Sequence, residues 1–130
     1  MQYNTAHAAY SQNAVGGIES PTKLIEMLYE GVLRFIFRAR KAMQDNDVEK
    51  KVYFINRTNA IFIELLNSLD YNQGNVAHYL SGLYTRQIQL LSIANINNDE
   101  QSLNEVVSVT KQLLEAWKET TGAGQADVAG

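Results

Sequence analysis

Histidines, carboxylates and arginines are the side chains of this chain that could do acid–base, metal or phosphate chemistry. There are two histidines, His7 and His78. A carboxylate-bridged di-iron bundle needs Glu and His three residues apart on one helix, and no glutamate here is followed three residues later by a histidine. The two histidines have neither a zinc-ligand spacing nor a triad arrangement, so we interpret both as solvated surface residues.

Charged residues one helical turn apart gather between positions 26 and 41. Glu26 precedes Glu30 by one turn, and Glu30 precedes Arg34 by one turn. This spacing is more typical of helix-surface pairs than of an acid–base couple, so we expect a solvated face. The basic stretch that follows consists of Arg34, Arg38, Arg40 and Lys41. It could contact phosphate, but the two glutamates dilute it and no aromatic stacking platform accompanies it, so we interpret it as solvated surface too.

Composition excludes several further classes of protein. The chain has 130 residues, no cysteine and a formal net charge of −3. One domain is expected at this length, and the lack of cysteine removes disulfides, thiolate zinc sites and cysteine nucleophiles. The net negative charge supplies no broad field for nucleic acid. The sequence therefore predicts a non-enzymatic protein with no cofactor, no metal and no nucleic-acid partner.

Targeting and membrane signals are also missing from the sequence. The first residues lack the basic and apolar regions of a signal peptide, and no run approaches the ~18 uninterrupted apolar residues of a membrane span. We expect a cytoplasmic protein with no membrane span.

Helix signals divide the middle of the chain into four helices. Ser20 is a typical N-cap before Pro21 at the first helical position, Asp47 can cap a second helix, and Gly74 with Asn75 as a cap marks the start of the third. The expected helices are 21–44, 48–69, 76–95 and 102–120. Because short connections favour antiparallel neighbours, we predict an all-α fold, an antiparallel four-helix bundle over residues 20–121.

The segments on either side of the bundle are different. Residues 1–19 are small and polar, with Gly16 and Gly17 as a joint, and we interpret them as a flexible N-terminal arm that could form a short capping helix. Its apolar Tyr10 and Val15 either pack weakly, as chain ends often do, or lie in a groove until a ligand displaces them. Residues 122–130 are expected to be a disordered C-terminal tail.

The apolar arcs of the four helices are wider than one buried stripe requires. On the first helix the expected core face consists of Leu24, Leu28, Val32 and Phe35. Ile25 and Tyr29 lie on its flank. Two explanations stay open, namely deep burial helped by the arm or a second copy of the chain, and a groove for a partner helix. Gly31 inside this helix costs up to about 1 kcal/mol against alanine, which suggests close helix packing or a partner's backbone nearby.

Ordered motifs give the sequence a family resemblance. An arm tyrosine and valine, in YSQNAV, precede five further segments. These are SPTKLIEMLYEG from Ser20, ELLNSLD from Glu64, YLSGLY from Tyr79, LSIANINND from Leu91 and LNEVVSVTKQLLEAWKE from Leu103. Over this length the chain resembles the FliS family of flagellin-specific export chaperones.

The resemblance implies a helical bundle in the bacterial cytosol that binds the disordered C-terminal segment of flagellin. Binding would prevent premature polymerisation and keep flagellin competent for flagellar type III secretion, with a cochaperone or an export-apparatus component as a further partner. By this analogy Tyr10 and Val15 form a displaceable arm over a hydrophobic site, and either the arm or the client would touch Ile25 and Tyr29. The helical wheels add groove candidates, namely Ile61, Leu65, Tyr79, Leu83 and Ile88.

Two alternatives stay open from the sequence. One is a homodimeric helical structural or adaptor module without a flagellin client, in which self-association covers the surplus apolar surface. The other is an RNA-binding regulator that uses the arginines of the first helix. Light scattering would test the first, and RNA titration at two salt concentrations the second.

Overall fold

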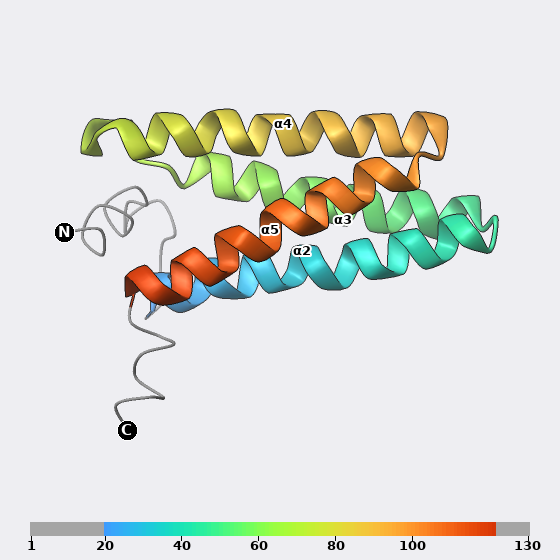
Figure 1. Cartoon of the computed structure of the whole chain (residues 1–130), viewed down its shortest axis with the longest axis horizontal. Coiled ribbons are helices and arrows are strands. Elements are labelled where there is room, and N and C mark those ends of the chain that lie inside the picture. Colours follow the sequence, from blue (N-terminus) through green and yellow to red (C-terminus); the bar gives the residue numbers. More distant parts are fainter. Residues whose placement is uncertain (1–19, 122–130) are drawn as a thin grey trace, which may run out of the picture.

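The structure is a computed structural model that describes residues 20–121. This part of the chain folds into four α-helices and one short 3₁₀ turn (Figure 1). The elements are α2 (Pro21–Gln44), α3 (Val48–Asn67), η1 (Tyr71–Gln73), α4 (Asn75–Asn97) and α5 (Glu100–Thr121). The predicted all-α fold is confirmed. The proposed arm with Tyr10 and Val15, and the proposed tail, lie outside the described residues.

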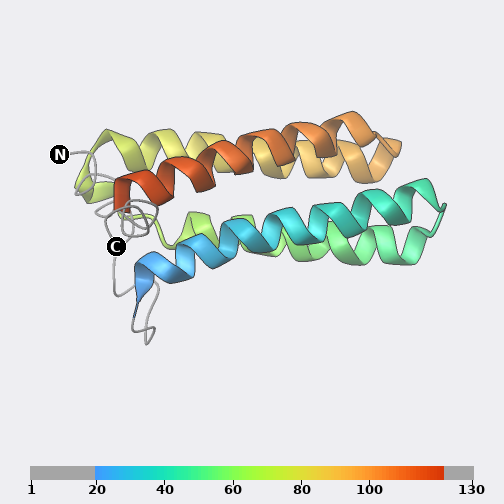
Figure 2. The same cartoon turned by 60° about the horizontal axis from the view of Figure 1, so that its bottom comes forward.

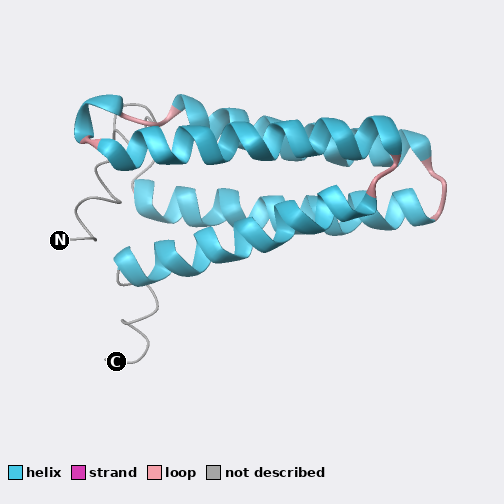
Figure 3. Ribbon diagram, turned by 45° about the horizontal axis from the view of Figure 1, so that its top comes forward, coloured by secondary structure: helices cyan, strands magenta, loops and turns pink. Residues whose placement is uncertain are grey.

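The helices run up and down to form two hairpins. Each helix packs along two neighbours, since α2 lies against α3 and α5, and α4 lies against the same two helices. Figure 2 shows the α2–α3 hairpin and the α4–α5 hairpin as two layers. The start of α2 and the end of α5 share one end of the bundle, here called the terminal end. The α2–α3 and α4–α5 loops lie at the opposite end, here called the turn end (Figure 3).

Two predicted helix caps are confirmed. The Ser20 hydroxyl accepts a hydrogen bond from the Lys23 backbone N–H at 3.2 Å, with Pro21 at the first helical position. At the start of α3, the Asp47 carboxylate accepts from the Lys50 backbone N–H at 3.1 Å. Each cap satisfies a donor that has no partner within its own helix, which fixes where the helix begins.

The start of α4 differs from the prediction. Asn75 is the first helical residue and not the cap, and Gly74 stands at the cap position with a φ of 112° and no side-chain hydrogen bond to the helix. The φ of Gly74 is therefore in the positive range. Because a residue without Cβ adopts this conformation freely, glycine itself turns the chain into the helix. The preceding helix ends at Asn67, two residues earlier than expected.

The last helix begins earlier than the sequence indicated. It starts at Glu100, where Ser102 was expected. The Asp99 carboxylate accepts hydrogen bonds from the Gln101 backbone N–H at 3.1 Å and from the Ser102 hydroxyl at 2.8 Å. Asp99 therefore acts as the N-cap, and α5 is about half a turn longer at its start than the sequence predicts.

All four helices contribute to one apolar core. Fully buried members include Ile36 of α2, Phe62 of α3, Leu91 of α4 and Leu103 of α5. Burying one such side chain stabilises the fold by about 1.5–3 kcal/mol. The core therefore absorbs much of the apolar surplus that the sequence showed.

The orientation of α2 corrects the predicted core face. Val32 is buried as expected, but Leu24, Leu28 and Phe35 are only half-buried. The ring of Phe35 stacks on the ring of Phe54 of α3, with centroids 6.1 Å apart. The helix is thus rotated so that this row meets α3, which leaves the centre of the bundle to the adjacent row.

Candidate partner-binding surface

Three of the predicted groove residues lie inside the core. The exposed fractions of Ile25, Tyr29 and Leu65 are 0%, 2% and 0%. The prediction that Ile25 and Tyr29 lie on the flank of the first helix is therefore wrong. The hydroxyls of Tyr29 and Tyr84 are 2.6 Å apart, a buried hydrogen bond between α2 and α4. The ring of Tyr84 also packs on Phe62, with centroids 6.0 Å apart.

The other four predicted groove residues lie at the edge of the core or outside it. Ile61, Leu83 and Ile88 are half-buried, whereas Tyr79 is 67% exposed. Ile61 lies at the boundary of α2 and α3, because its Cδ1 is 3.0 Å from the place where a Cβ on Gly31 would be.

The structure joins only some of these residues into one row. Tyr79 and Leu83 are one turn apart on α4, so their side chains share a face. Ile88 follows Leu83 by five residues, which places it about 140° further around the helix. The compact unit is the Tyr79–Leu83 row at the terminal end, while Ile61 and Ile88 occupy separate edges of the bundle.

Two polar contacts lie at the terminal end of the bundle. The indole Nε1 of Trp117 donates to the Thr22 carbonyl at 2.9 Å, which joins α5 to the start of α2. Lys23 donates to the carboxylate of Glu26 at 2.6 Å. This hydrogen bond, together with the charge of Glu26, raises the pKa of Lys23. Glu26 is only 8% exposed, so the prediction that it belongs to a solvated face is wrong.

Large apolar side chains remain exposed on α2, α3 and α4, and in η1. Among the described residues they are Met27, Phe37, Val48, Tyr53, Ile63, Tyr71, Tyr79, Ile93 and Ile96. The exposed fractions run from 38% for Ile93 to 76% for Ile96. The described part of the protein therefore keeps apolar surface available for contact with another molecule.

The basic stretch of α2 is more ordered than the sequence suggested. Arg40 donates to the Asn104 side chain at 2.7 Å, and Lys41 pairs with Asp45 at 3.3 Å. The guanidinium of Arg38 lies over the ring of Phe54, 5.7 Å from its centroid. An aromatic ring of the neighbouring helix thus lies beside the basic stretch, with Arg38 over its face. The sequence contains a signal for this contact. Arg38 and Phe54 are each eight residues from Asn46 in the hairpin turn, so they lie at the same level of the two antiparallel helices.

Residues 20–121 contain neither a metal-binding cluster nor a membrane-spanning helix. His78 is exposed and its ring packs on Tyr71, with centroids 5.2 Å apart. Within this range no three His, Asp or Glu side chains gather closely enough to hold a metal ion, and no helix is long and apolar enough to cross a membrane. His7 lies outside the described residues.

Fold and surface together define a helical-bundle binding protein, with apolar side chains exposed along its length. A family model described as "Flagellar protein FliS" matches residues 2–124. The flagellar secretion chaperone FliS of Campylobacter jejuni is 66% identical over 120 residues, which cover 92% of this chain and 93% of that protein. The Salmonella typhimurium chaperone of the same name is 35% identical, over 88% and 86% of the two chains. The Bacillus subtilis chaperone is 31% identical, over 98% and 94%.

The chain belongs to the FliS family. Its function is that of a flagellar secretion chaperone, as the ordered motifs implied.

Proposed function

We propose that this chaperone binds the disordered C-terminal segment of flagellin in the bacterial cytosol, without catalysis. Binding keeps that segment from polymerising and holds flagellin ready for type III export. Family membership supports the chaperone role, and the exposed apolar side chains supply the means of binding.

The Tyr79–Leu83 row is the observation that carries this proposal. Tyr79 is 67% exposed and stands one turn before the half-buried Leu83. A large apolar side chain gains about 1.5–3 kcal/mol when it is buried. A disordered client loses conformational entropy on binding, so it needs several contacts of this kind.

The buried groove candidates have a different part in the proposal. Ile25, Tyr29 and Leu65 are buried, so they support the client site from within the core, and Ile61 and Ile88 are candidates for further client contacts at separate edges of the bundle. Tyr10 and Val15 form a cover that the client replaces when it binds. This exchange of one apolar partner for another would let the site stay covered between clients.

A flagellin truncation tests the proposed client. Flagellin without its C-terminal helical region should bind far more weakly than full-length flagellin in a calorimetric titration, because the segment that fills the apolar site is missing. Equal affinity for the two forms would show that the client segment is wrong.

Tyr79→Asp tests the proposed surface, with Ile96→Asp as its matched control. Both residues are exposed on α4, at 67% and 76% respectively, but Ile96 lies at the turn end. A charge buried against the client costs several kcal/mol unless it is paired, so Tyr79→Asp should weaken flagellin binding by about tenfold or more. Ile96→Asp should leave it unchanged. The reverse result would move the client site to the turn end, and circular dichroism checks that both variants fold.

A cochaperone or an export-apparatus component is a further proposed partner of the chaperone–flagellin complex. Light scattering at two protein concentrations separates this role from self-association. A monomer that forms a complex with flagellin supports the proposal, whereas a constant dimer that ignores flagellin favours the homodimeric module.

A further inference from the structure

A cluster of aromatic rings covered by arginines lies where α2 meets α3. The rings of Phe35 and Phe54 stack with centroids 6.1 Å apart, and Tyr53 meets Phe54 edge-on at 5.1 Å. Arg38 lies over the Phe54 ring at 5.7 Å, and Arg57 lies over the Phe35 ring at 5.4 Å. We call these five residues the arginine–aromatic seam. Each half-buried phenylalanine thus has a cation above it, in place of apolar cover.

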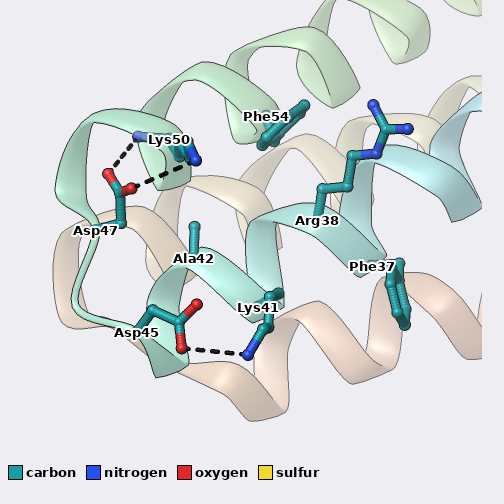
Figure 4. A pocket seen from close by; sticks show the side chains of 8 residues that line it. All are labelled: Phe37, Arg38, Lys41, Ala42, Asp45, Asp47, Lys50 and Phe54. Carbon is teal, nitrogen blue, oxygen red and sulfur yellow. Dashed lines mark hydrogen bonds and ion pairs between the residues drawn. The ribbon is translucent and has the colours of Figure 1, made fainter.

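A surface pocket of about 370 Å³ adjoins this seam at the turn end. Phe37, Arg38, Lys41, Ala42, Asp45, Asp47, Lys50 and Phe54 line it (Figure 4). Phe37 at its edge is 64% exposed, the largest exposed fraction among the aromatic side chains of α2 and α3. The pocket therefore combines an apolar contact surface with charged groups, as peptide-binding sites often do.

Charge at the seam and its adjoining pocket is only partly balanced within residues 20–121. Lys41 pairs with Asp45, and Lys50 approaches Asp47 at 4.0 Å. No carboxylate among residues 20–121 forms an ion pair with the three arginines of this face, Arg34, Arg38 and Arg57. A guanidinium presents several N–H groups in a plane that matches a carboxylate. The guanidinium groups of the seam are thus available to pair with carboxylates of another molecule.

The two hairpins differ in net charge, which strengthens this preference. From residue 20 to 67 the chain has eight lysines and arginines against six acidic residues, and from 68 to 121 it has three against six. The positive hairpin contains the seam. A negatively charged partner is therefore favoured on the α2–α3 hairpin over the α4–α5 hairpin.

Protein fits the seam better than RNA does. Phe35 and Phe54 have their faces covered by guanidinium groups, so they are not free to stack on bases. A helical peptide does not need a free ring face, because it can place carboxylates on the arginines and an apolar side chain in the adjoining pocket.

We propose that the arginine–aromatic seam is a docking site for an acidic amphipathic helix of a second protein partner. Carboxylates of that helix pair with Arg38 and Arg57, and an apolar side chain one or two turns away packs on Phe37 and Phe54. The proposal does not depend on flagellin as the client. The seam lies towards the turn end, whereas the Tyr79–Leu83 row lies at the terminal end, so a helix bound at the seam leaves that row free.

Two synthetic helices and two matched variants test the proposal. One fluorescein-labelled peptide has leucines on one face and glutamates on the other, and the second has lysines in place of the glutamates. By fluorescence anisotropy the glutamate peptide should bind saturably and more weakly at high salt, and the lysine peptide should not bind. Arg38→Gln with Arg57→Gln should weaken binding about tenfold or more, since two charge pairs are lost. Arg86→Gln is the control, because Arg86 is exposed on α4.

Each other outcome overturns the proposal. Equal binding of the two peptides would mean that apolar contact alone acts, and tighter binding of a poly(U) RNA would mean a phosphate site. A dimer that dissociates in the double variant would make a second copy the occupant. Loss of flagellin binding in the double variant, with its thermal unfolding unchanged, would assign the seam to the client. Retained flagellin binding with loss of the glutamate peptide is the expected result.

Discussion

Gly31 lies where α2 packs closely against α3. A Cβ added there would lie 3.0 Å from the Cδ1 of Ile61. That distance is shorter than ordinary van der Waals contact, and the atom involved is the end of a flexible side chain. Of the two explanations for this glycine, close packing of the helices is the one that the structure supports.

Gly31→Ala should therefore change stability differently in two backgrounds. In the natural chain, the gain of about 1 kcal/mol from helix propensity is offset by crowding against Ile61, so the net change should stay within about 0.5 kcal/mol. In an Ile61→Val background the crowding atom is absent, and the same substitution should stabilise the fold by about 1 kcal/mol. Urea unfolding of the four variants measures both values. Equal effects in the two backgrounds would mean that Ile61 does not limit this position.

Residue-level burial was only partly predictable. Leu24 and Ile25 are adjacent and both apolar, so the wheel of α2 has no polar boundary between the row that faces the centre and the row that faces α3. The rotation of the helix is decided by contacts that the sequence does not display, such as the stacking of Phe35 on Phe54. A wide apolar arc predicts deep packing but not which row is innermost.

Lys51 joins two helices at the turn end. Its side chain is buried, with 5% exposure for the residue, and its Nζ donates to the Asn95 carbonyl at 2.9 Å and to the Asn98 side chain at 2.7 Å. Asn98 ends α4 in the left-handed conformation, with a φ of 51°. The ammonium group thus binds carbonyl oxygens where the helix dipole is negative.

Lys51→Met should destabilise the fold by about 1–3 kcal/mol, because charge-assisted hydrogen bonds between α3 and the end of α4 are lost while the side-chain volume is kept. Lys50→Met is the matched control. The neighbouring side chain of Lys50 is 72% exposed, and its contact with Asp47 is 4.0 Å long, so its loss should change stability by less than about 0.5 kcal/mol. Chemical unfolding of both variants gives the difference. Equal costs would show that burial of Lys51 confers no stability.

Helix boundaries followed from local chemistry wherever a cap lies next to its helix. Ser20 and Asp47 were predictable because their side chains bond to N–H groups three residues ahead. Asn75 was misassigned because Gly74 starts α4 through its backbone conformation, with no side-chain hydrogen bond. Local sequence therefore predicted the elements more reliably than it predicted the contacts between them.

At the scale of the whole molecule, surfaces form from residues that are distant in the chain. The order of helices was predictable from short connections, and the Tyr79–Leu83 row follows from one helix alone. The arginine–aromatic seam was not recognised, because each cation lies on one helix and its ring on the next. Net charge also concealed it, because the value of −3 is the sum of a positive α2–α3 hairpin, a negative α4–α5 hairpin and two acidic residues outside them, Glu19 and Asp127.

The Tyr29–Tyr84 hydrogen bond crosses between the two hairpins, so it reports on how they are held together. Its two hydroxyls are buried and 2.6 Å apart. Tyr29→Phe or Tyr84→Phe should each cost about 0.5–1.5 kcal/mol of stability or somewhat more, because either removes the bond.

The double variant should cost less than the sum of the two single variants, since the bond can be lost only once; the coupling should be about 0.5–1.5 kcal/mol. Tyr79→Phe is the control, because that tyrosine is 67% exposed and its change should stay within about 0.5 kcal/mol. Thermal or urea unfolding of the four variants gives the coupling. Strictly additive costs would mean that the hydroxyls act separately, and that apolar packing alone joins the hairpins at this level of the bundle.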